Sequence, residues 1–205
     1  MYKIFINNKC IELTDNNTDL KEGTMRIEYE NHGTFEYAVQ VLSNRKDILC
    51  VRIEHLDPDY LLGKLLAKYK IILAAGGLVE NEQGELLIIF RHQKWDLPKG
   101  KLKKNENEAL GAIREVQEEC GVKNLTIVSP LSPTYHIYEL KGKLILKKTF
   151  WFKMFCEKKQ DLVPQLEEDI TKVEWFKPEN LNKVYANTYG SIAQVLNEFQ
   201  NKRLD

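Results

Sequence analysis

The sequence predicts an α/β fold in which strands and helices interleave along the chain. Segments of alternating apolar and polar residues, typical of strands, are separated by segments with helical spacing and capping residues. Because 43% of the 205 residues are hydrophobic, the chain can bury a proper core, and its 29% charged residues are ordinary for a globular protein. No internal repeat or low-complexity segment interrupts this pattern.

Residues 1–69 form a first predicted module, a small α+β domain whose role the sequence leaves open. Strands at Tyr2–Ile6 and Lys9–Leu13 flank an Asn7-Asn8 turn and predict a hairpin. Asp57 is the expected cap of a helix with Pro58 in its first turn. The other elements predicted for this module are strands at 25–29 and 48–53 and helices at 35–42 and 57–69.

Residues 70–205 form the second predicted module. It begins with a strand at 71–79 that contains Gly76-Gly77, and a turn at Asn81–Gly84 leads into a strand at 85–91. We predict a loop shaped by Pro98 and Gly100, and then a helix at 107–120 closed by Gly121. The remaining predictions are strands at 125–129, 136–140, 144–156 and 171–176, a helical turn after Pro178 and a final helix at about 191–202.

Three carboxylates share one face of the helix at 107–120. Glu115, Glu118 and Glu119 stand at positions i, i+3 and i+4, so they repel one another by a few tenths of a kcal/mol per pair. A divalent cation would remove that repulsion, and a ligand set of oxygens without Cys or His suits Mg²⁺ or Mn²⁺ better than Zn²⁺. The alternative for an acidic helix taken by itself is a solvated surface face.

The residues around this helix have the spacing of the Nudix box. Gly100 is followed after five residues by Glu106, and after seven more by Arg114, Glu115 and the run that ends at Gly121-Val122. The sequence therefore resembles the Nudix hydrolases, which cleave a nucleoside diphosphate linked to another group. This resemblance implies an α/β/α sandwich with a mixed sheet over about residues 70–205.

The resemblance also implies roles for individual residues. It assigns metal binding to Gly100, through its backbone carbonyl, and to Glu115, Glu118 and Glu119. In some branches of the family the position of Glu115 acts as general base.

The family pattern pairs Arg114 with Glu106 to orient the helix, although Arg114 could instead pair with Glu118 across one turn. Nudix enzymes often recruit a further acidic residue from outside the box. We select Glu168 for this catalytic role, from the run Glu167-Glu168-Asp169.

Basic residues gather just before the box, so phosphate would be attracted locally although the chain is neutral overall. Arg91, Lys99 and Lys101 are the candidate phosphate contacts, whereas Lys103 and Lys104 fit a solvated loop. The string Leu97–Lys101 resembles the branch that cuts diadenosine polyphosphates. It also occurs in nucleotide-sanitising branches, and a similar string is found in mRNA-decapping members.

A later strand carries a second group of candidate substrate contacts. Strand alternation places Lys148, Phe150 and Phe152 on one face and Lys147, Thr149 and Trp151 on the other. A basic residue followed by aromatics resembles the diadenosine tetraphosphate hydrolases, where such residues meet phosphate and stack on adenine. The alternative is that the aromatics belong to the sheet core.

Charge and cysteine content limit the classes of partner. Thirty basic and thirty acidic residues cancel, so no global field attracts nucleic acid or a membrane. The four cysteines (Cys10, Cys50, Cys120 and Cys156) show neither metal-type nor disulfide-type spacing and indicate reduced thiols. With no signal peptide and no apolar run of membrane-spanning length, we expect a soluble cytoplasmic protein.

The leading hypothesis is a Mg²⁺-dependent Nudix pyrophosphohydrolase that cleaves a nucleotide polyphosphate, with diadenosine tetraphosphate as the first substrate to consider. The alternatives are a nucleotide-sanitising or ADP-ribose-type hydrolase, then an RNA-decapping enzyme, which usually needs an extended basic stripe. A Nudix-fold ligand sensor or scaffold is the alternative outside the enzymes, although its box is usually damaged. The sequence does not decide whether the protein forms a homodimer, which substrate it cleaves or which phosphorus atom is attacked.

Overall fold

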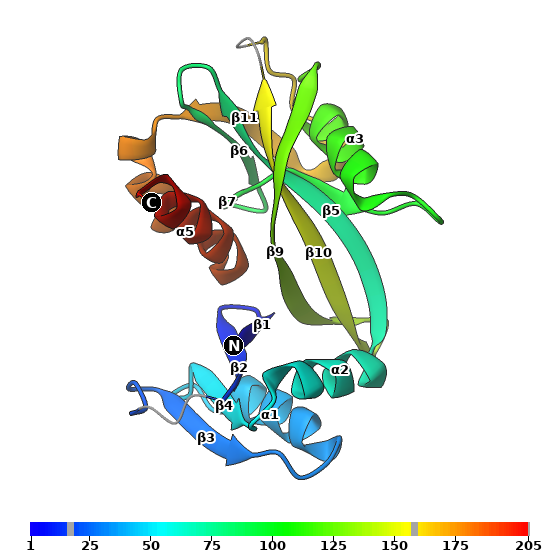
Figure 1. The fold of residues 1–205 in the computed structure, drawn as a ribbon, viewed down its shortest axis with the longest axis vertical. Helices are drawn as coiled ribbons and strands as arrows, with labels where there is room; N and C mark the ends of the chain where they lie inside the picture. Colours follow the sequence, from blue (N-terminus) through cyan, green and yellow to red (C-terminus); the bar gives the residue numbers. More distant parts are fainter. Residues whose placement is uncertain (16–18, 157–159, 205) are drawn as a thin grey trace. The chain divides into compact units, whose positions relative to one another are not determined.

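The computed structural model describes residues 1–15, 19–156 and 160–204. They form two compact units (Figure 1). The first, unit 1, contains Met1–Ile72 together with Tyr135–Lys147, and the second, unit 2, contains Leu73–Thr134 together with Lys148–Asp205. A hairpin tip from the second half of the chain therefore belongs to the same compact unit as the N-terminal residues.

Unit 1 is built on a mixed sheet in the order β10-β9-β1-β2-β4-β3. The hairpin β1–β2 is antiparallel, whereas β4 runs parallel to both of its neighbours, β2 and β3. On its other side β1 pairs in parallel with β9, with Ile4 opposite Tyr135. The strands that belong wholly to this unit are β1 (Tyr2–Ile6), β2 (Lys9–Thr14), β3 (Thr24–Glu28) and β4 (Cys50–Glu54).

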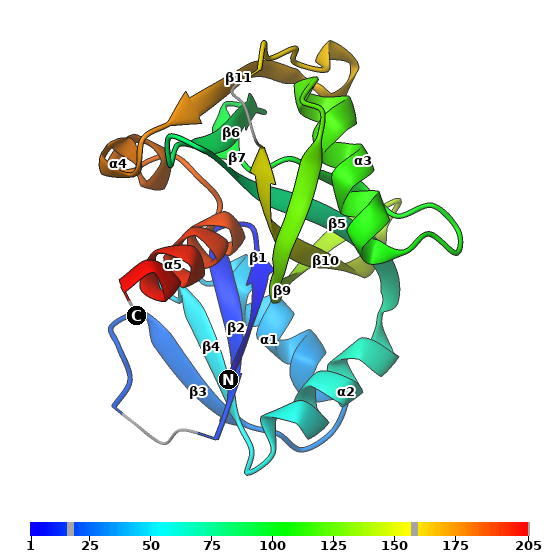
Figure 2. The same cartoon turned by 45° about the horizontal axis from the view of Figure 1, so that its top comes forward.

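Helices α1 (Gly33–Asn44) and α2 (Pro58–Lys68) pack on one face of this sheet (Figure 2). Alternate residues of the strands, such as Ile11 and Leu13 of β2, point into the core that the helices cover, and both are fully buried. Asp57 caps α2 as predicted, because its carboxylate accepts a hydrogen bond from the backbone N–H of Tyr60 at 3.0 Å.

Unit 2 contains a second part of the sheet in the order β11-β6-β5-β10-β9, with β7 paired to β6 and β8 paired to β5. The bounds of these strands are β5 Lys70–Asn81, β6 Leu86–Arg91, β7 Lys94–Asp96, β8 Lys99–Lys101, β9 Leu125–Leu140, β10 Lys143–Cys156 and β11 Ile170–Phe176. The helices are α3 Glu108–Cys120, η1 Leu166–Glu168, η2 Pro178–Asn180, α4 Asn182–Tyr185 and α5 Gly190–Leu204.

Helices α3 and α5 cover opposite faces of the sheet in unit 2 (Figure 1). Strand β6 shows the alternation that makes this possible: Leu87 and Ile89 pack with α3, and Leu86 and Ile88 pack with α5. The predicted α/β/α sandwich with a mixed sheet is therefore confirmed. Among the described residues, no helix is both long and apolar enough to span a membrane.

Two details of the predicted elements were wrong. The strands expected at 125–129 and 136–140 form one continuous strand, β9, which includes Pro130 and Pro133. Within unit 2 this strand lies at the edge of the sheet, where a proline, which lacks an N–H donor, is tolerated.

The loop predicted around Pro98 and Gly100 contains the short strand β8, and another short strand, β7, lies just before it. Strand β8 lies against β5, with Gly100 opposite Ala75 and Lys99 opposite Gly76. A Cβ atom on Gly76 would lie 2.5 Å from the Cβ of Lys99, so only glycine permits this close approach. The strand character of three residues thus depends on a partner strand that is distant in sequence.

Candidate active site

Helix α3 presents the carboxylates because its ends and its buried face are fixed. The side chain of Asn107 accepts hydrogen bonds from the backbone N–H groups of Ala109 and Leu110 at 3.0 and 3.2 Å. At the other end Gly121 adopts the left-handed conformation (φ +75°) that a C-terminal cap requires. Ala112 and Val116 lie in the core, and this buried face fixes the rotation of the helix, with Glu115 directly before Val116.

Arg114 connects the carboxylates of the box. Its guanidinium donates two hydrogen bonds to Glu106, at 2.7 and 2.8 Å, and further bonds to Glu115 at 2.6 Å and to Glu118 at 2.8 Å. Both pairings that the sequence left open, with Glu106 and with Glu118, are therefore formed. The bond from Arg114 holds the pKa of Glu106 at about 2, helped by the backbone N–H of Lys103.

Glu115 lies directly against the backbone of Gly100. A Cβ atom added to Gly100 would fall 1.8 Å from a carboxylate oxygen of Glu115, so glycine is required for the carboxylate to occupy this place. Burial raises the pKa of Glu115, and the ion pair with Arg114 opposes that rise. The glycine at position 100 is therefore required sterically, because the carboxylate of Glu115 occupies the space of a side chain there.

We expect Gly100→Ala to lower kcat by on the order of a hundredfold, because the new methyl group displaces the Glu115 carboxylate by about an ångström or more. Stability should change by less than about 1 kcal/mol, since the clash involves the flexible end of one side chain. The matched control is Gly63→Ala on α2, where an added Cβ meets no atom within 4 Å. A Gly100→Ala protein with full activity would contradict the placement of Glu115.

Glu119 is the most deeply buried of the three carboxylates, with 2% of its side chain exposed. One oxygen accepts the backbone N–H of Lys99 at 2.8 Å, and the other lies 3.4 Å from a guanidinium nitrogen of Arg91. Burial nevertheless raises its pKa to about 7, against the opposing effects of Lys99 and Arg91. A desolvated carboxylate of this kind gains most from a cation in contact with it.

This burial gives an expected pH dependence of stability in metal-free protein. Because the folded-state pKa of Glu119 lies above the usual 4.5, its contribution to stability is present at low pH and is lost as pH rises through about 7. The loss amounts to roughly 3 kcal/mol at most. The Glu119→Gln variant should not show this loss of stability with rising pH. In urea unfolding with EDTA, its free energy of unfolding should exceed that of wild type at about pH 8 and differ little from it at about pH 5. Parallel stability curves for the two proteins would contradict this assignment.

Residues 163–165 lie against the C-terminal end of α3. The backbone N–H groups of Val163 and Gln165 donate to the carbonyls of Cys120 and Glu119, at 2.9 and 3.2 Å. In the following turn, η1, the carboxylate of Glu168 lies 3.4 Å from the guanidinium of Arg91. A groove of about 370 Å³ is lined by Glu118, Gly121 and residues 163–167.

Arg91 therefore bridges Glu119 and Glu168, at 3.4 Å from each. Glu168, chosen from sequence as the acidic residue outside the box, lies beside the carboxylate face of α3, and 55% of its side chain is exposed. Arg91 itself, predicted as a phosphate contact, is only 17% exposed.

Lys99 is engaged in a contact that the sequence analysis missed. Its ammonium group lies 2.5 Å from the carboxylate of Asp96, which is 4% exposed and also accepts the backbone N–H of Leu97. The spacing of Asp96 and Lys99 at i and i+3 was the available signal. A phosphate group that contacts Lys99, as predicted, would therefore compete with Asp96 for the ammonium group.

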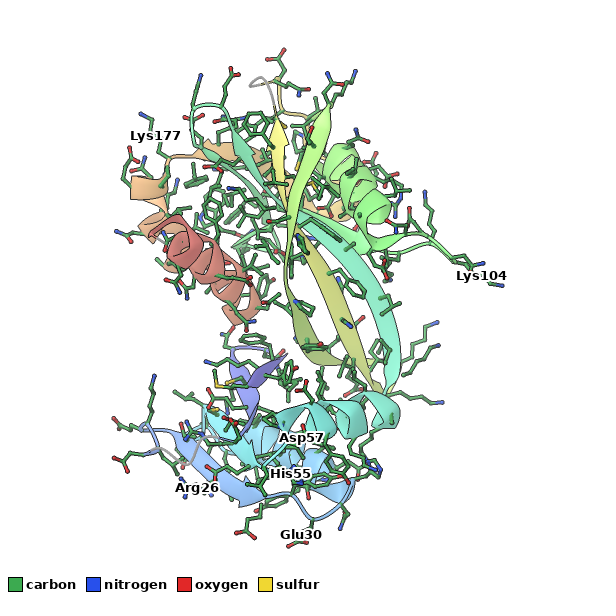
Figure 3. All side chains as sticks on the ribbon, viewed as in Figure 1. Arg26, Glu30, His55, Asp57, Lys104 and Lys177 are labelled. Atoms are coloured by element: carbon green, nitrogen blue, oxygen red, sulfur yellow. The ribbon has the colours of Figure 1, made fainter. Side chains whose placement is uncertain are left out.

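The other predicted substrate contacts lie at different depths. Lys101 is exposed, and its backbone carbonyl accepts a bond from Arg114 at 3.2 Å. Lys104 projects from the loop before α3, which fits the solvated position expected for it (Figure 3).

On β10 the predicted alternation holds. Trp151 is buried and donates its indole N–H to Thr134 at 2.9 Å, whereas Phe150 and Phe152 are half-buried beside the core under α3. The ammonium of Lys148 lies over the Phe150 ring, 4.6 Å from its centroid. At least one of the three aromatic residues is thus sheet core, which was the alternative to substrate contact.

The three carboxylates of α3 are held by different partners. Arg114 holds Glu115 and Glu118, whereas Lys99 and Arg91 hold Glu119. Their oxygens do not all lie within 4.8 Å of one another, so a shared cation would require rotation of these side chains. The donor set itself fits Mg²⁺ or Mn²⁺, because it offers only carboxylate oxygens beside the backbone of Gly100.

Comparison with known proteins decides the family. The profile of the NUDIX domain matches residues 70–197. The chain belongs to the Nudix domain family. In this Nudix protein the matched residues include the whole of α3 and all of the strands from β5 to β11, and the match ends within α5.

Two known relatives are similar to this Nudix chain over 57% of its length. The m7GpppN-mRNA hydrolase of Saccharomyces cerevisiae is 27% identical over 129 residues, and the MutT-like protein of Streptomyces ambofaciens is 29% identical over 119 residues. The matched region is 12% of the yeast protein and 71% of the Streptomyces protein. The Nudix chain therefore spans only a small part of the length of the yeast relative.

Among solved structures, an Ap4A hydrolase from C. elegans has the same fold as this Nudix chain. The two superpose with a TM-score of 0.51 and 24% identity, over 65% of this chain and 98% of the other. This likeness agrees with the sandwich of helices and mixed sheet described above.

Proposed function

We propose that the protein is a divalent-metal-dependent hydrolase that cleaves a phosphoanhydride bond in a nucleoside polyphosphate. The observation that carries this proposal is the arrangement around α3, where Gly100 provides the space for Glu115 and Arg114 links Glu106, Glu115 and Glu118. An intact set of contacts of this kind supports an enzyme over a ligand sensor, in which we expect the box to be damaged.

Glu115, Glu118 and Glu119, with the backbone of Gly100, are the residues that would hold Mg²⁺ or Mn²⁺. When bound, such an ion polarises phosphoryl oxygens and lowers the pKa of a bound water. The part of Arg114 and Glu106 is to fix the helix, because their bidentate ion pair ties the loop before α3 to the middle of the helix.

A base is needed to accept the proton of the attacking water. Glu115 is our first candidate, because its position acts as general base in some branches of the family and because burial raises its pKa. Glu168 is the second candidate, since it is exposed and lies next to Arg91 on the same side as the acidic residues.

For the substrate we propose a phosphate chain longer than a diphosphate. Lys101 supplies an exposed cation and Lys148 a half-buried one over the Phe150 ring. Arg91 and Lys99 supply two more, each in an ion pair with a carboxylate. Phe150 and Phe152 are half-buried, which leaves part of each ring for stacking on a base. The Ap4A hydrolase from C. elegans suggests diadenosine tetraphosphate as the first substrate to assay.

We expect the protein to cleave diadenosine tetraphosphate in Mg²⁺ with a higher kcat/KM than ADP-ribose. Lys148→Ala should lower the ratio of the two kcat/KM values by roughly tenfold or less, because it removes one proposed phosphate contact and leaves the carboxylates in place. The matched control is Lys143→Ala, an exposed lysine at the start of the same strand. Equal or better turnover of ADP-ribose would contradict the polyphosphate proposal and favour an ADP-ribose-type or nucleotide-sanitising enzyme.

The yeast relative is a hydrolase of capped mRNA, so a capped RNA belongs in the same substrate panel. We expect it to be a poor substrate, because thirty basic and thirty acidic residues leave the chain without the net positive charge that favours RNA.

A further inference from the structure

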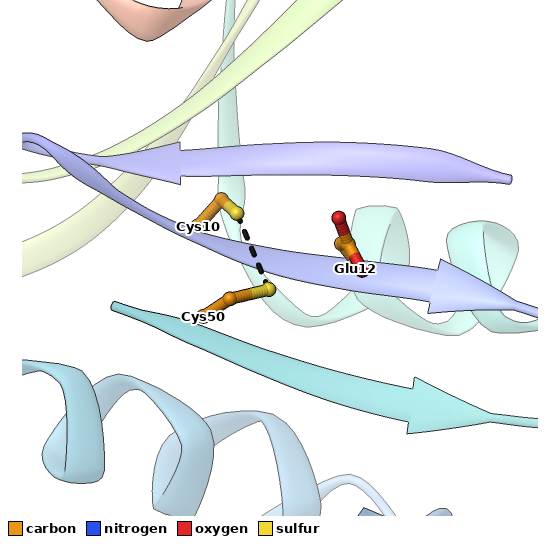
Figure 4. Close-up of side chains that lie close together, drawn as sticks. All are labelled: Cys10, Glu12 and Cys50. Carbon is orange, nitrogen blue, oxygen red and sulfur yellow. Dashed lines mark hydrogen bonds between the residues drawn. The ribbon is translucent and has the colours of Figure 1, made fainter. Parts of the chain in front are cut away.

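Unit 1 brings together two thiols that are 40 residues apart in the sequence. Cys10 on β2 and Cys50 on β4 are register partners on neighbouring parallel strands, and their Sγ atoms lie 3.4 Å apart (Figure 4). Because side chains alternate along a strand, Glu12 points to the same side as Cys10. The two sulfurs and a carboxylate oxygen of Glu12 all lie within 4.8 Å of one another.

This cluster lies on the face of the sheet opposite to α1 and α2. Ile11 and Leu13, which alternate with Cys10 and Glu12, are the residues that pack with those helices. Cys10 and Cys50 are both half-buried, so the sulfurs are neither sealed in the core nor freely solvated. The cluster therefore has no role in the hydrophobic core of unit 1.

Two basic residues lie beside the carboxylate of the cluster. Lys3 and Arg52 lie 3.2 and 3.4 Å from the carboxylate oxygens of Glu12. Two thiolates and Glu12 carry three negative charges, so a divalent ion would leave one, and Lys3 and Arg52 place two positive charges beside Glu12. The hydrogen bond between the two thiols lowers the pKa of Cys10, whereas that bond and burial raise the pKa of Cys50.

The sulfurs lie at the contact distance of two reduced thiols, and a shared metal ion would need them only slightly farther apart. In a tetrahedral site with Zn–S bonds of about 2.3 Å, two sulfurs lie about 3.8 Å apart. In a disulfide they lie about 2.05 Å apart. The observed 3.4 Å is closer to the metal spacing, and the β2–β4 ladder holds the two backbones at this register.

We propose that Cys10, Glu12 and Cys50 form a binding site for Zn²⁺ or a similar thiophilic divalent cation. Thiolate sulfur with one carboxylate is a soft donor set, unlike the oxygen-only set on α3, so the two sites would select different metals. With three protein ligands, the fourth position falls to water. The bound ion would tie β2 to β4 and so stabilise unit 1.

The test is titration of the reduced 205-residue chain with Cd²⁺, a probe for zinc–thiolate sites, in millimolar Mg²⁺ so that hard-metal sites are occupied. We expect one equivalent of Cd²⁺ to produce an ultraviolet thiolate-to-metal charge-transfer band, and Zn²⁺ to displace it. Cys10→Ser and Cys50→Ser should abolish or greatly weaken the band. Glu12→Gln should keep the band but lower the affinity by roughly tenfold or more.

Cys120→Ala is the matched control, because it removes a buried thiol outside the cluster and should leave the titration unchanged. Circular dichroism establishes that each variant is folded. The number of Cd²⁺ ions bound per wild-type chain tests the proposal without any variant. Absence of the band in reduced wild type, or its survival in Cys50→Ser, would overturn the proposal. A pair that oxidises to a disulfide and takes up no Cd²⁺ when reduced would overturn it in favour of a redox pair.

Discussion

Glu118→Gln should lower turnover by on the order of a thousandfold while leaving the fold intact. The substitution removes a proposed metal ligand and keeps the size of the side chain, so the loss falls on the chemical step. Stability should change by less than about 1 kcal/mol, because Glu118 is 46% exposed and its ion pair with Arg114 is a surface pair. Steady-state hydrolysis in Mg²⁺ and thermal unfolding in EDTA measure the two effects separately.

The matched control for this variant is Glu108→Gln, which removes a carboxylate from the first turn of the same helix. It should retain nearly full activity, with a cost of less than about 1 kcal/mol from the lost interaction with the helix dipole. If Glu118→Gln kept wild-type activity, or Glu108→Gln lost as much, the assignment of the metal ligands would be wrong.

Mg²⁺ or Mn²⁺ should stabilise the wild-type protein against heat. A ligand that binds only the folded state adds RT ln(1 + [L]/Kd), which is about 2.7 kcal/mol at a hundredfold excess over Kd. For a chain of this length the gain corresponds to roughly 5 to 10 °C in the midpoint of unfolding. Part of the effect comes from Glu119, whose burial is unfavourable until a cation compensates its charge.

The shift should vanish when Glu115, Glu118 and Glu119 are all replaced by Gln. The triple variant should be at least as stable as wild type in EDTA, since it no longer places like charges on one helix face. Glu108→Gln should keep the full shift. A shift that persists in the triple variant would place the principal Mg²⁺ site elsewhere, since the thiol pair of unit 1 is a poor ligand set for Mg²⁺.

Local spacing predicted the parts of the site that lie within one stretch of chain. The helix at α3, its caps at Asn107 and Gly121, and the common face of its carboxylates all depend on residues that are close in sequence. Arg114 was expected to choose between Glu106 and Glu118, and the structure shows both contacts because a guanidinium has several donors in a fork.

Contacts between distant segments escaped the sequence analysis. Arg91 and Glu168 are 77 residues apart, and no local pattern predicts that Arg91 lies between Glu168 and Glu119. The short strand β8 exists because Gly76 lets it approach β5. Cys10 and Cys50 likewise meet only through the pairing of β2 with β4, so their spacing in sequence indicated neither a metal site nor a disulfide.

The most direct test of the proposed function is addition of Mg²⁺ to EDTA-treated protein in the presence of diadenosine tetraphosphate, ADP-ribose, nucleoside triphosphates and capped RNA. Nucleotide products should appear only after Mg²⁺ is added, fastest from diadenosine tetraphosphate, and should stop on return of EDTA. Binding of these compounds in Mg²⁺ without turnover of any of them would contradict the enzyme assignment and indicate a ligand sensor.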